Sequence, residues 1–383
     1  MKPLIFKAAA VFISVLAFLA VLEIVVRVFN LAQPRLGQQD PVFGTSYIAG
    51  QTAINEYGVE IEIGGHGYRG PTPAPDKPAG VYRVVLLGDS FLQARVLPYE
   101  QVFYSILNER FKKQGRPIEV INMGVEGYGT AQEYLVYRHQ ARRYRPDLVI
   151  LFFYVGNDLQ ENYPPQENRP GFKLKDGRLE YVPFEVKGRR RGPVKDFLRK
   201  HVRLYNYLPD LFRAAAGNLS EWVSGEEKAR RLEEHRLQFE QSADLEPTRR
   251  AMEFRELDSA WQVTLKVMEK LKNEAAADGA VLALADFPMI TQVYDRYWNL
   301  LLSRNPGVDT SGWDRFGPQR ILEEFARQEG IRYLPFSRFL AETARKTGRM
   351  YYLPGDYHFS APAHELLAEF FEPIILEYYR KRF

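Results

Sequence analysis

Apolar runs and helically spaced apolar residues alternate along this chain in a way that predicts strands separated by helices. Short apolar runs bounded by turn residues predict strands at 81–87, 118–121, 147–155, 281–285 and 331–334. Helical spacing predicts helices at 100–114, from 130, at 257–273 and 320–328, and from about 362. Strands alternating in this way with helices indicate a parallel sheet covered on both faces.

Two of these elements carry further signals. Residues 148–154 are all apolar, which is typical of a central strand buried on both faces. Thr130 and Glu133 have the spacing of a capping box, so we expect Thr130 to cap the helix that follows.

The first thirty residues predict a membrane anchor. From Ala8 to Val26 the chain is apolar apart from Ser14 and Glu23, which nearly suffices to span a hydrocarbon core of roughly 30 Å. Glu23 precedes Arg27 by four residues, and an ion pair at the interface would relieve its cost in lipid. The flanking charges favour the amino terminus inside and the remaining chain outside.

Two other interpretations of this apolar stretch remain open. A cleavable signal peptide usually has a shorter apolar region followed by small residues at a cleavage site, and no convincing A-x-A pattern follows here. A buried amino-terminal helix is the second alternative.

Residues 31–80 are rich in Gly, Pro and polar side chains. This composition predicts a tether followed by an irregular flap, with no separate domain. Tyr68 and Arg69 lie in its glycine-rich part, where we expect them to serve packing.

Composition excludes several classes of protein. Of the 383 residues 45% are hydrophobic, enough for the core of a large domain. The net charge of +4 does not suggest a nucleic-acid partner, and no G-x-G-x-x-G or P-loop follows the first strand. The absence of cysteine removes thiol nucleophiles and Cys-type zinc sites. No metal or cofactor site is apparent.

Candidate chemistry lies at two distant places in the sequence. Ser90 follows the first predicted strand of the sheet in the turn 88–90, and Asp356 and His358 lie near the end of the chain. Serine with His and Asp is the combination that makes a hydroxyl nucleophilic. Ser90 alone could merely cap a helix. His364 lies near His358, but only His358, of the six histidines, has a carboxylate two residues upstream.

Two further blocks, 122–127 and 156–158, follow the next two predicted strands. The four blocks, in this order, resemble the SGNH (GDSL-type) hydrolase superfamily. The resemblance implies a flavodoxin-like three-layer α/β/α sandwich with a parallel sheet of about five strands, spanning 81–383 with a helical insertion at about 160–255. Similar glycine-and-arginine stretches occur in membrane-anchored bacterial members, which implies a single-pass protein of the bacterial inner membrane with a periplasmic domain.

The resemblance also implies roles for single residues. Ser90 would be the nucleophile, His358 the general base, and Asp356 the group that holds the imidazole. The oxyanion hole would comprise the amides of Ser90 and Gly127 and the side chain of Asn157. Secondary candidates are Gly124, Asp89 and Asp158, of which Gly124 is a weaker oxyanion donor and Asp158 a loop brace. The family most often has D-x-x-H, whereas this chain has Asp356 and His358 with a single residue between them.

The insertion contains a strongly basic stretch at 187–203 followed by apolar residues at helical spacing. A basic amphipathic helix can lie on an anionic membrane. The alternative is an ordinary helix whose apolar stripe packs on the sheet domain. Residues 226–255 are charge-dense and predict a solvated helix and loop.

The favoured function is hydrolysis of O-acyl esters of a lipid or glycan through an acyl-serine intermediate. The same residues would serve an O-acetyltransferase or O-acyltransferase of an extracytoplasmic polysaccharide, which would need a membrane partner to deliver acyl groups. A noncatalytic binding or scaffold protein with a relic site is the third possibility.

Overall fold

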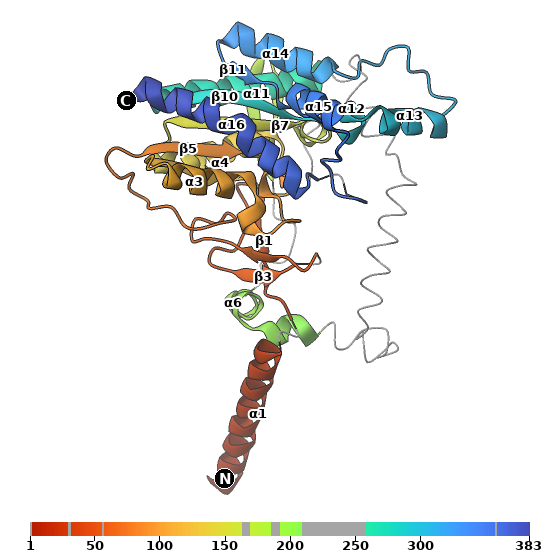
Figure 1. Cartoon of the computed structure of the whole chain (residues 1–383). Helices are drawn as coiled ribbons and strands as arrows, with labels where there is room; N and C mark the ends of the chain where they lie inside the picture. The colour runs from red at the N-terminus through yellow and green to blue at the C-terminus, as the bar shows by residue number, and fades with distance from the viewer. Residues whose placement is uncertain are drawn as a thin grey trace.

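A five-stranded parallel sheet forms the centre of the computed structural model, which describes residues 2–29, 32–55, 57–162, 169–184, 192–208, 258–356 and 358–383 (Figure 1). Its strands are ordered β11-β10-β7-β5-β6. They span Tyr82–Leu87 (β5), Ile118–Asn122 (β6), Leu148–Tyr154 (β7), Val281–Phe287 (β10) and Arg332–Leu334 (β11). All four pairings are parallel, and the order is that of a flavodoxin-like doubly wound sheet, so the predicted fold class is confirmed.

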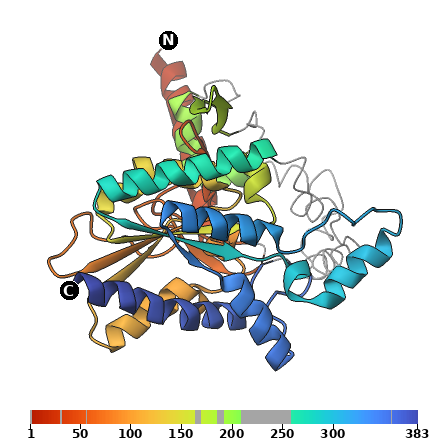
Figure 2. The ribbon, with the colours of Figure 1, turned by 90° about the horizontal axis from the view of Figure 1, so that it is seen from above.

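Helices cover both faces of the sheet. One face carries α4, α5, α11 and α14, with bounds Thr130–His139, Asp158–Asn162, Asp258–Ala277 and Gly317–Glu329. The other face carries α3, α15 and α16, with bounds Phe103–Lys113, Phe336–Thr347 and Ala361–Arg382. Figure 2 shows the sheet between α11 on one side and α16 on the other. Shorter helices α2 (Ser90–Gln93), α12 (Ile290–Val293) and α13 (Asp295–Arg304) and 3-10 turns at Tyr99–Gln101 and Ala141–Tyr144 lie in the connections.

The core consists of two apolar clusters separated by the sheet. Along β5, alternate residues serve opposite faces: Val85 and Leu87 belong to one cluster, Val84 and Leu86 to the other. Every residue of β5 is buried, as is typical of a central strand under helices on both sides. This buried strand holds the turn that follows it, and with it Ser90, on a rigid support.

The segment 31–80 contains more regular structure than the expected irregular flap. Two antiparallel hairpins occupy it: β1 (Gly37–Asp40) with β2 (Gly44–Tyr47), and β3 (Thr52–Ile54) with β4 (Glu60–Glu62). Phe43 and Tyr68 from this segment are buried in the apolar core. The strands are only three or four residues long, which is too short for alternation to reveal them in the sequence. The hairpins lie between the first helix and the sheet domain (Figure 1).

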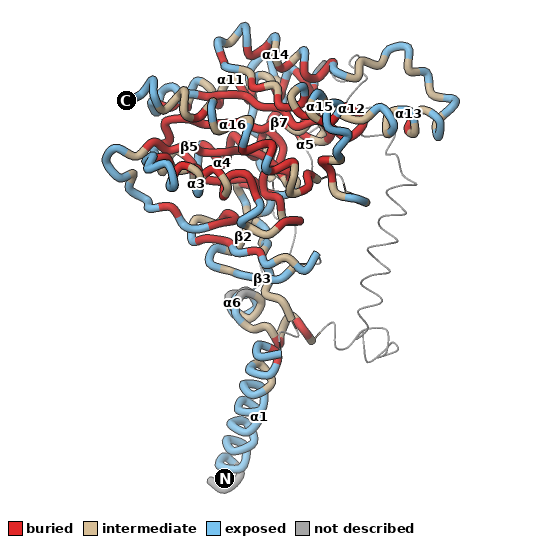
Figure 3. Tube along the Cα trace, viewed as in Figure 1, coloured by how far each residue is buried: buried red, intermediate tan, exposed pale blue. Residues whose placement is uncertain are grey.

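Helix α1 (Lys2–Val28) projects from the domain and is exposed along most of its length (Figure 3). Residues 5–28 are long and apolar enough to cross a membrane, judged by length and composition. Near its end, Glu23 pairs with Arg27 at 2.7 Å, as the sequence predicts. Glu23 also accepts hydrogen bonds from the backbone N–H groups of Arg203 and Leu204, at 3.0 and 2.7 Å.

The described parts of the insertion include one hairpin, one basic helix and a further helical stretch at 203–208. The hairpin pairs β8 (Gly171–Lys175) with β9 (Arg178–Val182), and the helix is α6 (Pro193–His201). Leu204 and Tyr207, just beyond α6, pack against Val26 of α1 in a small apolar cluster. Residues 187–191 of the basic stretch lie outside the described residues. So do residues 226–255, for which a solvated helix and loop are predicted.

Candidate active site

The predicted site residues follow the carboxyl ends of adjacent strands. Ser90 begins α2 after β5, and Asn157 lies between β7 and α5. The chain order reverses between β5 and β7, which is where doubly wound sheets bind their ligands. Gly127 lies in the loop after β6, the other neighbour of β5.

Asp89 shapes the turn that presents Ser90. Its Oδ1 accepts a hydrogen bond from the backbone N–H of Phe91 at 2.9 Å, so Asp89 caps α2. Ser90 is the first residue of that helix, where a backbone N–H has no acceptor within the helix and points outward.

The structure brings Ser90, His358 and Asp356 together. Nε2 of His358 lies 2.9 Å from Oγ of Ser90, and Nδ1 lies 2.5 Å from Oδ1 of Asp356. The same Oδ1 accepts the backbone N–H of His358 at 2.8 Å, which closes the short Asp-x-His turn. With one residue between them, Asp356 and His358 are close enough for the carboxylate to reach the imidazole.

The acid and the imidazole shift each other's pKa. Burial disfavours the charged form of Asp356, but the hydrogen bond and positive charge of His358 outweigh it, so the pKa of Asp356 lies below its usual range. Burial likewise opposes protonation of His358, but the hydrogen bond and charge of Asp356, with smaller contributions from Asp89 and Glu126, raise its pKa. This arrangement favours an ionised Asp356 that orients the ring.

His358 is held by its surroundings as well as by Asp356. The ring of Phe91 lies 4.9 Å from its ring, and the His358 carbonyl accepts the N–H of Leu353 at 3.0 Å. His364, the nearby alternative, is fully buried, and its Nδ1 accepts the N–H of Phe103 at 3.3 Å. Burial lowers the pKa of His364 to about 3, so it stays neutral inside the core.

The two glycines proposed as oxyanion-hole donors, Gly127 and Gly124, differ in backbone conformation and in hydrogen bonding. Gly127 has a positive φ of 73°, and its carbonyl accepts a hydrogen bond from Arg169 at 2.7 Å. The N–H of Gly124 is already donated to Oδ1 of Asn122 at 2.9 Å, which makes Gly124 an anchor of the loop. A Cβ atom at position 124 would lie only 2.8 Å from the Leu92 side chain. Close packing against Leu92 therefore explains why this position is a glycine.

Asn157 and its neighbour Asp158 stand at the start of α5. The Asn157 carbonyl accepts the N–H of Glu161 at 2.9 Å, which begins that helix, while its side-chain amide stabilises the charged form of Asp89. Asp158 accepts the backbone N–H of Tyr154 at 3.0 Å. Asp158 therefore braces the turn that carries Asn157.

Three buried carboxyl groups lie behind the site: Asp89, Glu133 and Asp158. Burial raises the pKa of Asp89 to about 6. Burial also raises the pKa of Glu133 and of Asp158 well above the usual range, and repulsion among the three adds to it. Burial therefore favours the protonated forms of Glu133 and Asp158 up to a higher pH than is usual for a carboxyl.

The expected capping box is wrong in its register. The helix is capped at Gly129, whose N–H donates to Oε1 of Gln132 at 3.3 Å. Glu133 instead points into the interior, where neither carboxyl oxygen has a hydrogen-bond partner within the described residues. Only the Gln132 half of a capping box forms, because glycine has no side chain that could accept the Gln132 N–H.

Two residues of the amino-terminal segment reach the site region, although packing was the expected role there. Arg69 is fully buried and donates to the carbonyls of Gln93, Ala94 and Leu97, the last at 2.5 Å. It therefore holds the chain where it leaves α2, including Ala94 with its positive φ of 51°. The second residue is Tyr57, whose hydroxyl donates to Oδ2 of Asp356 at 3.0 Å.

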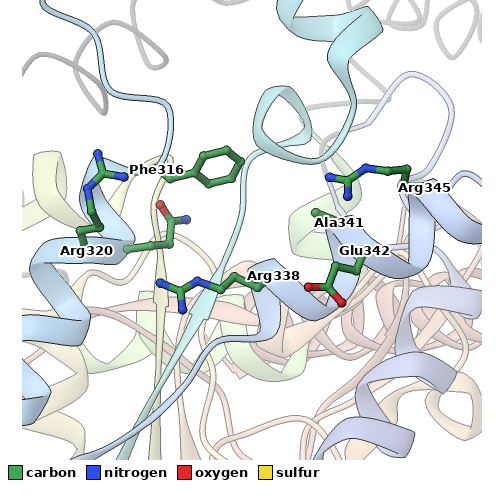
Figure 4. Close-up of a pocket in the computed structure, with 7 residues that line it drawn as sticks. Phe316, Arg320, Arg338, Ala341, Glu342 and Arg345 are labelled. Carbon is green, nitrogen blue, oxygen red and sulfur yellow. The ribbon is translucent and has the colours of Figure 1, made fainter.

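A separate hollow of about 360 Å³ lies between α14 and α15 (Figure 4). None of the three central site residues lines it. Two of its arginines are neutralised, Arg338 by Glu323 and Arg320 by Asp314, so it offers little free positive charge. Within the described residues, no group of three His, Cys, Asp or Glu side chains is arranged to hold a metal ion.

No protein-family model matches this chain, and no curated protein matches its sequence. Its structure is similar to that of TesA, at 14% identity over 77% of this chain and 99% of that one, with a TM-score of 0.39. It is also similar to the esterase EstA from a Pseudoalteromonas species, at 12% identity over 77% of this chain and 97% of that one, with a TM-score of 0.39. A catalytic mutant of Axe2, an acetylxylan esterase from Geobacillus stearothermophilus, gives 11% identity, 77% and 94% coverage and a TM-score of 0.40. At these identities and TM-scores the similarities do not identify a reaction for this chain.

Proposed function

We propose that this protein is a serine-dependent ester hydrolase of the SGNH type that acts through an acyl-serine intermediate. The observation that carries the proposal is the position of His358, whose two ring nitrogens lie 2.9 Å from the Ser90 hydroxyl and 2.5 Å from the Asp356 carboxylate. This is the relationship of nucleophile, base and orienting acid that activates serine in enzymes of several unrelated folds.

The chemistry follows from these contacts. Ser90 Oγ bonds to the carbonyl carbon of the ester while its proton passes to Nε2 of His358. The tetrahedral intermediate then collapses, the bond to the alcohol breaks, and the alcohol leaves with that proton. Water attacks the acyl-serine by the same route, releases the carboxylic acid and restores the Ser90 hydroxyl.

Stabilisation of the oxyanion is assigned to three donors: the amides of Ser90 and Gly127 and the side-chain amide of Asn157. The positive φ of Gly127 and the outward N–H at the start of α2 support this assignment. In the free protein Asn157 interacts with Asp89, so the assignment implies that its amide turns toward the substrate as negative charge develops.

The substrate class we propose is an O-acyl ester of a lipid or glycan. The test is to follow p-nitrophenol release from acetyl to decanoyl esters by the full chain in detergent, with and without a sugar acceptor and with Ser90→Ala as control. Serine-dependent release into water supports a hydrolase. Acylated sugar as the main product would identify an acyltransferase, and no Ser90-dependent turnover with either would favour a noncatalytic role.

We further propose that α1 anchors the protein in the bacterial inner membrane, with the domain on the periplasmic side and α6 on the membrane surface. Val194 and Phe197 of α6 are exposed, and the chain that follows α6 is hydrogen-bonded to Glu23 near the end of α1. An exposed apolar pair on a basic helix beside a membrane span is suited to an anionic lipid surface. Protease accessibility of the domain in spheroplasts tests the orientation. Unchanged binding to anionic vesicles by the domain without α1 after Lys195→Gln and Arg199→Gln would exclude a role for α6.

A further inference from the structure

The hydroxyl of Tyr57 contacts the one carboxylate oxygen of Asp356 that His358 leaves free. Oδ1 accepts both hydrogen bonds from His358, and Oδ2 accepts the hydrogen bond from Tyr57 at 3.0 Å. The carboxylate is therefore held from both sides, by His358 near the end of the chain and by Tyr57 near its beginning. Burial raises the pKa of Tyr57 to about 12, so its hydroxyl keeps its proton and remains a donor.

The loop that carries Tyr57 is braced from within. Asn55 Oδ1 accepts the backbone N–H groups of Tyr57 and Val59, each at 3.0 Å. The N–H of Asn55 donates to the Val59 carbonyl, also at 3.0 Å, and Gly58 takes a positive φ of 76° that suits the tight turn. These hydrogen bonds hold the backbone of the loop in one conformation. Less conformational entropy is therefore lost when the Tyr57 side chain makes its hydrogen bond to Asp356.

The same loop is tied to the chain that leaves the nucleophile helix. Asn55 Nδ2 donates to the Arg95 carbonyl at 2.7 Å, and the guanidinium of Arg95 lies 5.7 Å from the centre of the Tyr57 ring. Arg95 also pairs with Glu126 at 2.9 Å, next to Gly127. The β3–β4 hairpin thus connects the loops that carry Ser90, Gly127 and His358.

We propose that Tyr57 is a positioning residue of the active site: it fixes the Asp356 carboxylate for His358, and the β3–β4 hairpin is part of the catalytic structure. This inference rests on the proposed serine mechanism. The segment between the membrane span and the sheet domain then has a function beyond that of a tether.

Tyr57→Phe removes the hydroxyl and keeps the ring over Arg95. We expect kcat to fall about tenfold, the effect of losing one hydrogen bond to a charged group, with KM changed less than about twofold. Without the tyrosine donor the Asp356 carboxylate becomes more basic and attracts the His358 proton more strongly, so the acid limb of kcat/KM should move to higher pH. The other charged groups that face His358, Asp89 and Glu126, are unchanged in this variant.

Tyr68→Phe is the matched control. Its hydroxyl donates to Gln140 at 2.6 Å, in the same amino-terminal segment but away from the three central residues. This variant also loses one tyrosine hydrogen bond, and we expect its kcat and acid limb to stay at the wild-type values. A wild-type kcat and acid limb in Tyr57→Phe would overturn the inference while leaving the serine mechanism intact.

A measurement that needs no substrate distinguishes failure of the Tyr57 inference from failure of the proposed esterase function. The titration of the His358 ring by NMR, assigned with His358→Gln, should shift upward by about 0.5 pH unit in Tyr57→Phe and stay unchanged in Tyr68→Phe. An unchanged midpoint in Tyr57→Phe overturns the inference even if no substrate is found. If the midpoint shifts while wild type and Ser90→Ala react equally with esters, the proposed function fails and the contact stands.

Discussion

Oγ of Ser90 and Nε2 of His358 lie 2.9 Å apart, although 268 residues separate them in the chain. The first stands on a buried strand-to-helix turn and the second in a loop closed by the bridge between Tyr352 and Phe359. Their distance is therefore set by two separately supported loops of one sheet domain.

The pH dependence of ester hydrolysis should reflect the raised pKa of His358. His358 must be neutral to accept the serine proton, so activity should fall as the pH drops through a midpoint above 6.5. Asp356→Asn should move that midpoint down and lower kcat by on the order of 10³–10⁴, because the carboxylate that holds the imidazole is lost. A pH-rate profile of both proteins measures this. His139→Gln, which changes an exposed histidine, is the control, and an unshifted midpoint in Asp356→Asn would contradict the assignment.

Replacing Arg69 with Met should destabilise the fold. The substitution leaves three backbone carbonyls without their guanidinium donor, and we expect a loss of at least about 2 kcal/mol in the free energy of unfolding. Denaturant titration of the full chain in detergent measures the loss. Arg327→Met, at a side chain that is 72% exposed, should leave stability close to that of the wild type. Equal effects of the two substitutions would argue against the anchoring role of Arg69.

Glu133→Gln should stabilise the protein at alkaline pH. Because the pKa of Glu133 is raised in the folded state above 4.5, the folded state binds more protons than the unfolded state above that pH, and stability falls as the pH rises. The amide cannot ionise, so the variant should be more stable than the wild type at pH 8 and differ less from it at pH 4. Thermal unfolding between these values, with the exposed Glu324→Gln as control, tests the sign. Greater destabilisation at pH 8 than at pH 4 would refute it.

Glu23→Leu should release the chain that follows α6 from the first helix. The change removes the acceptor for the N–H groups of Arg203 and Leu204 while making α1 more apolar. We expect the protein to remain in the membrane but tryptic cleavage after Arg199 or Arg203 to accelerate several-fold in detergent. Lys7→Leu, near the other end of α1, should cleave at the wild-type rate. Identical cleavage in Glu23→Leu would show that these hydrogen bonds do not hold the segment.

The sequence predicts those parts of the structure that depend on a periodic pattern or on a short run of neighbouring residues. The five strands of the sheet were predicted to within a few residues, because buried parallel strands are continuous apolar runs such as 148–154. Ser90 and His358 were recognisable because each lies within a short block of characteristic residues. The hairpin at 52–62 was missed because its strands are three residues long.

The contacts that cross the chain could not be read from sequence. Tyr57 and Asp356 are 299 residues apart, and a lone tyrosine in a polar loop carries no pattern. For Arg69, the glycine-rich sequence around it does not indicate the three backbone carbonyls to which its guanidinium donates hydrogen bonds. Glu133 was misassigned because local capping signals do not reveal that a helix face is buried under the site.

The central claim is that Ser90 is a nucleophile activated by His358. A fluorophosphonate phosphonylates an activated serine far faster than an ordinary hydroxyl, so intact-mass analysis of the full chain after labelling tests it most directly. The account predicts one added label per chain, located on Ser90 by peptide mapping, absent in Ser90→Ala and greatly slowed in His358→Gln. Labelling at another residue, or labelling of Ser90 at the same rate in His358→Gln, would contradict it.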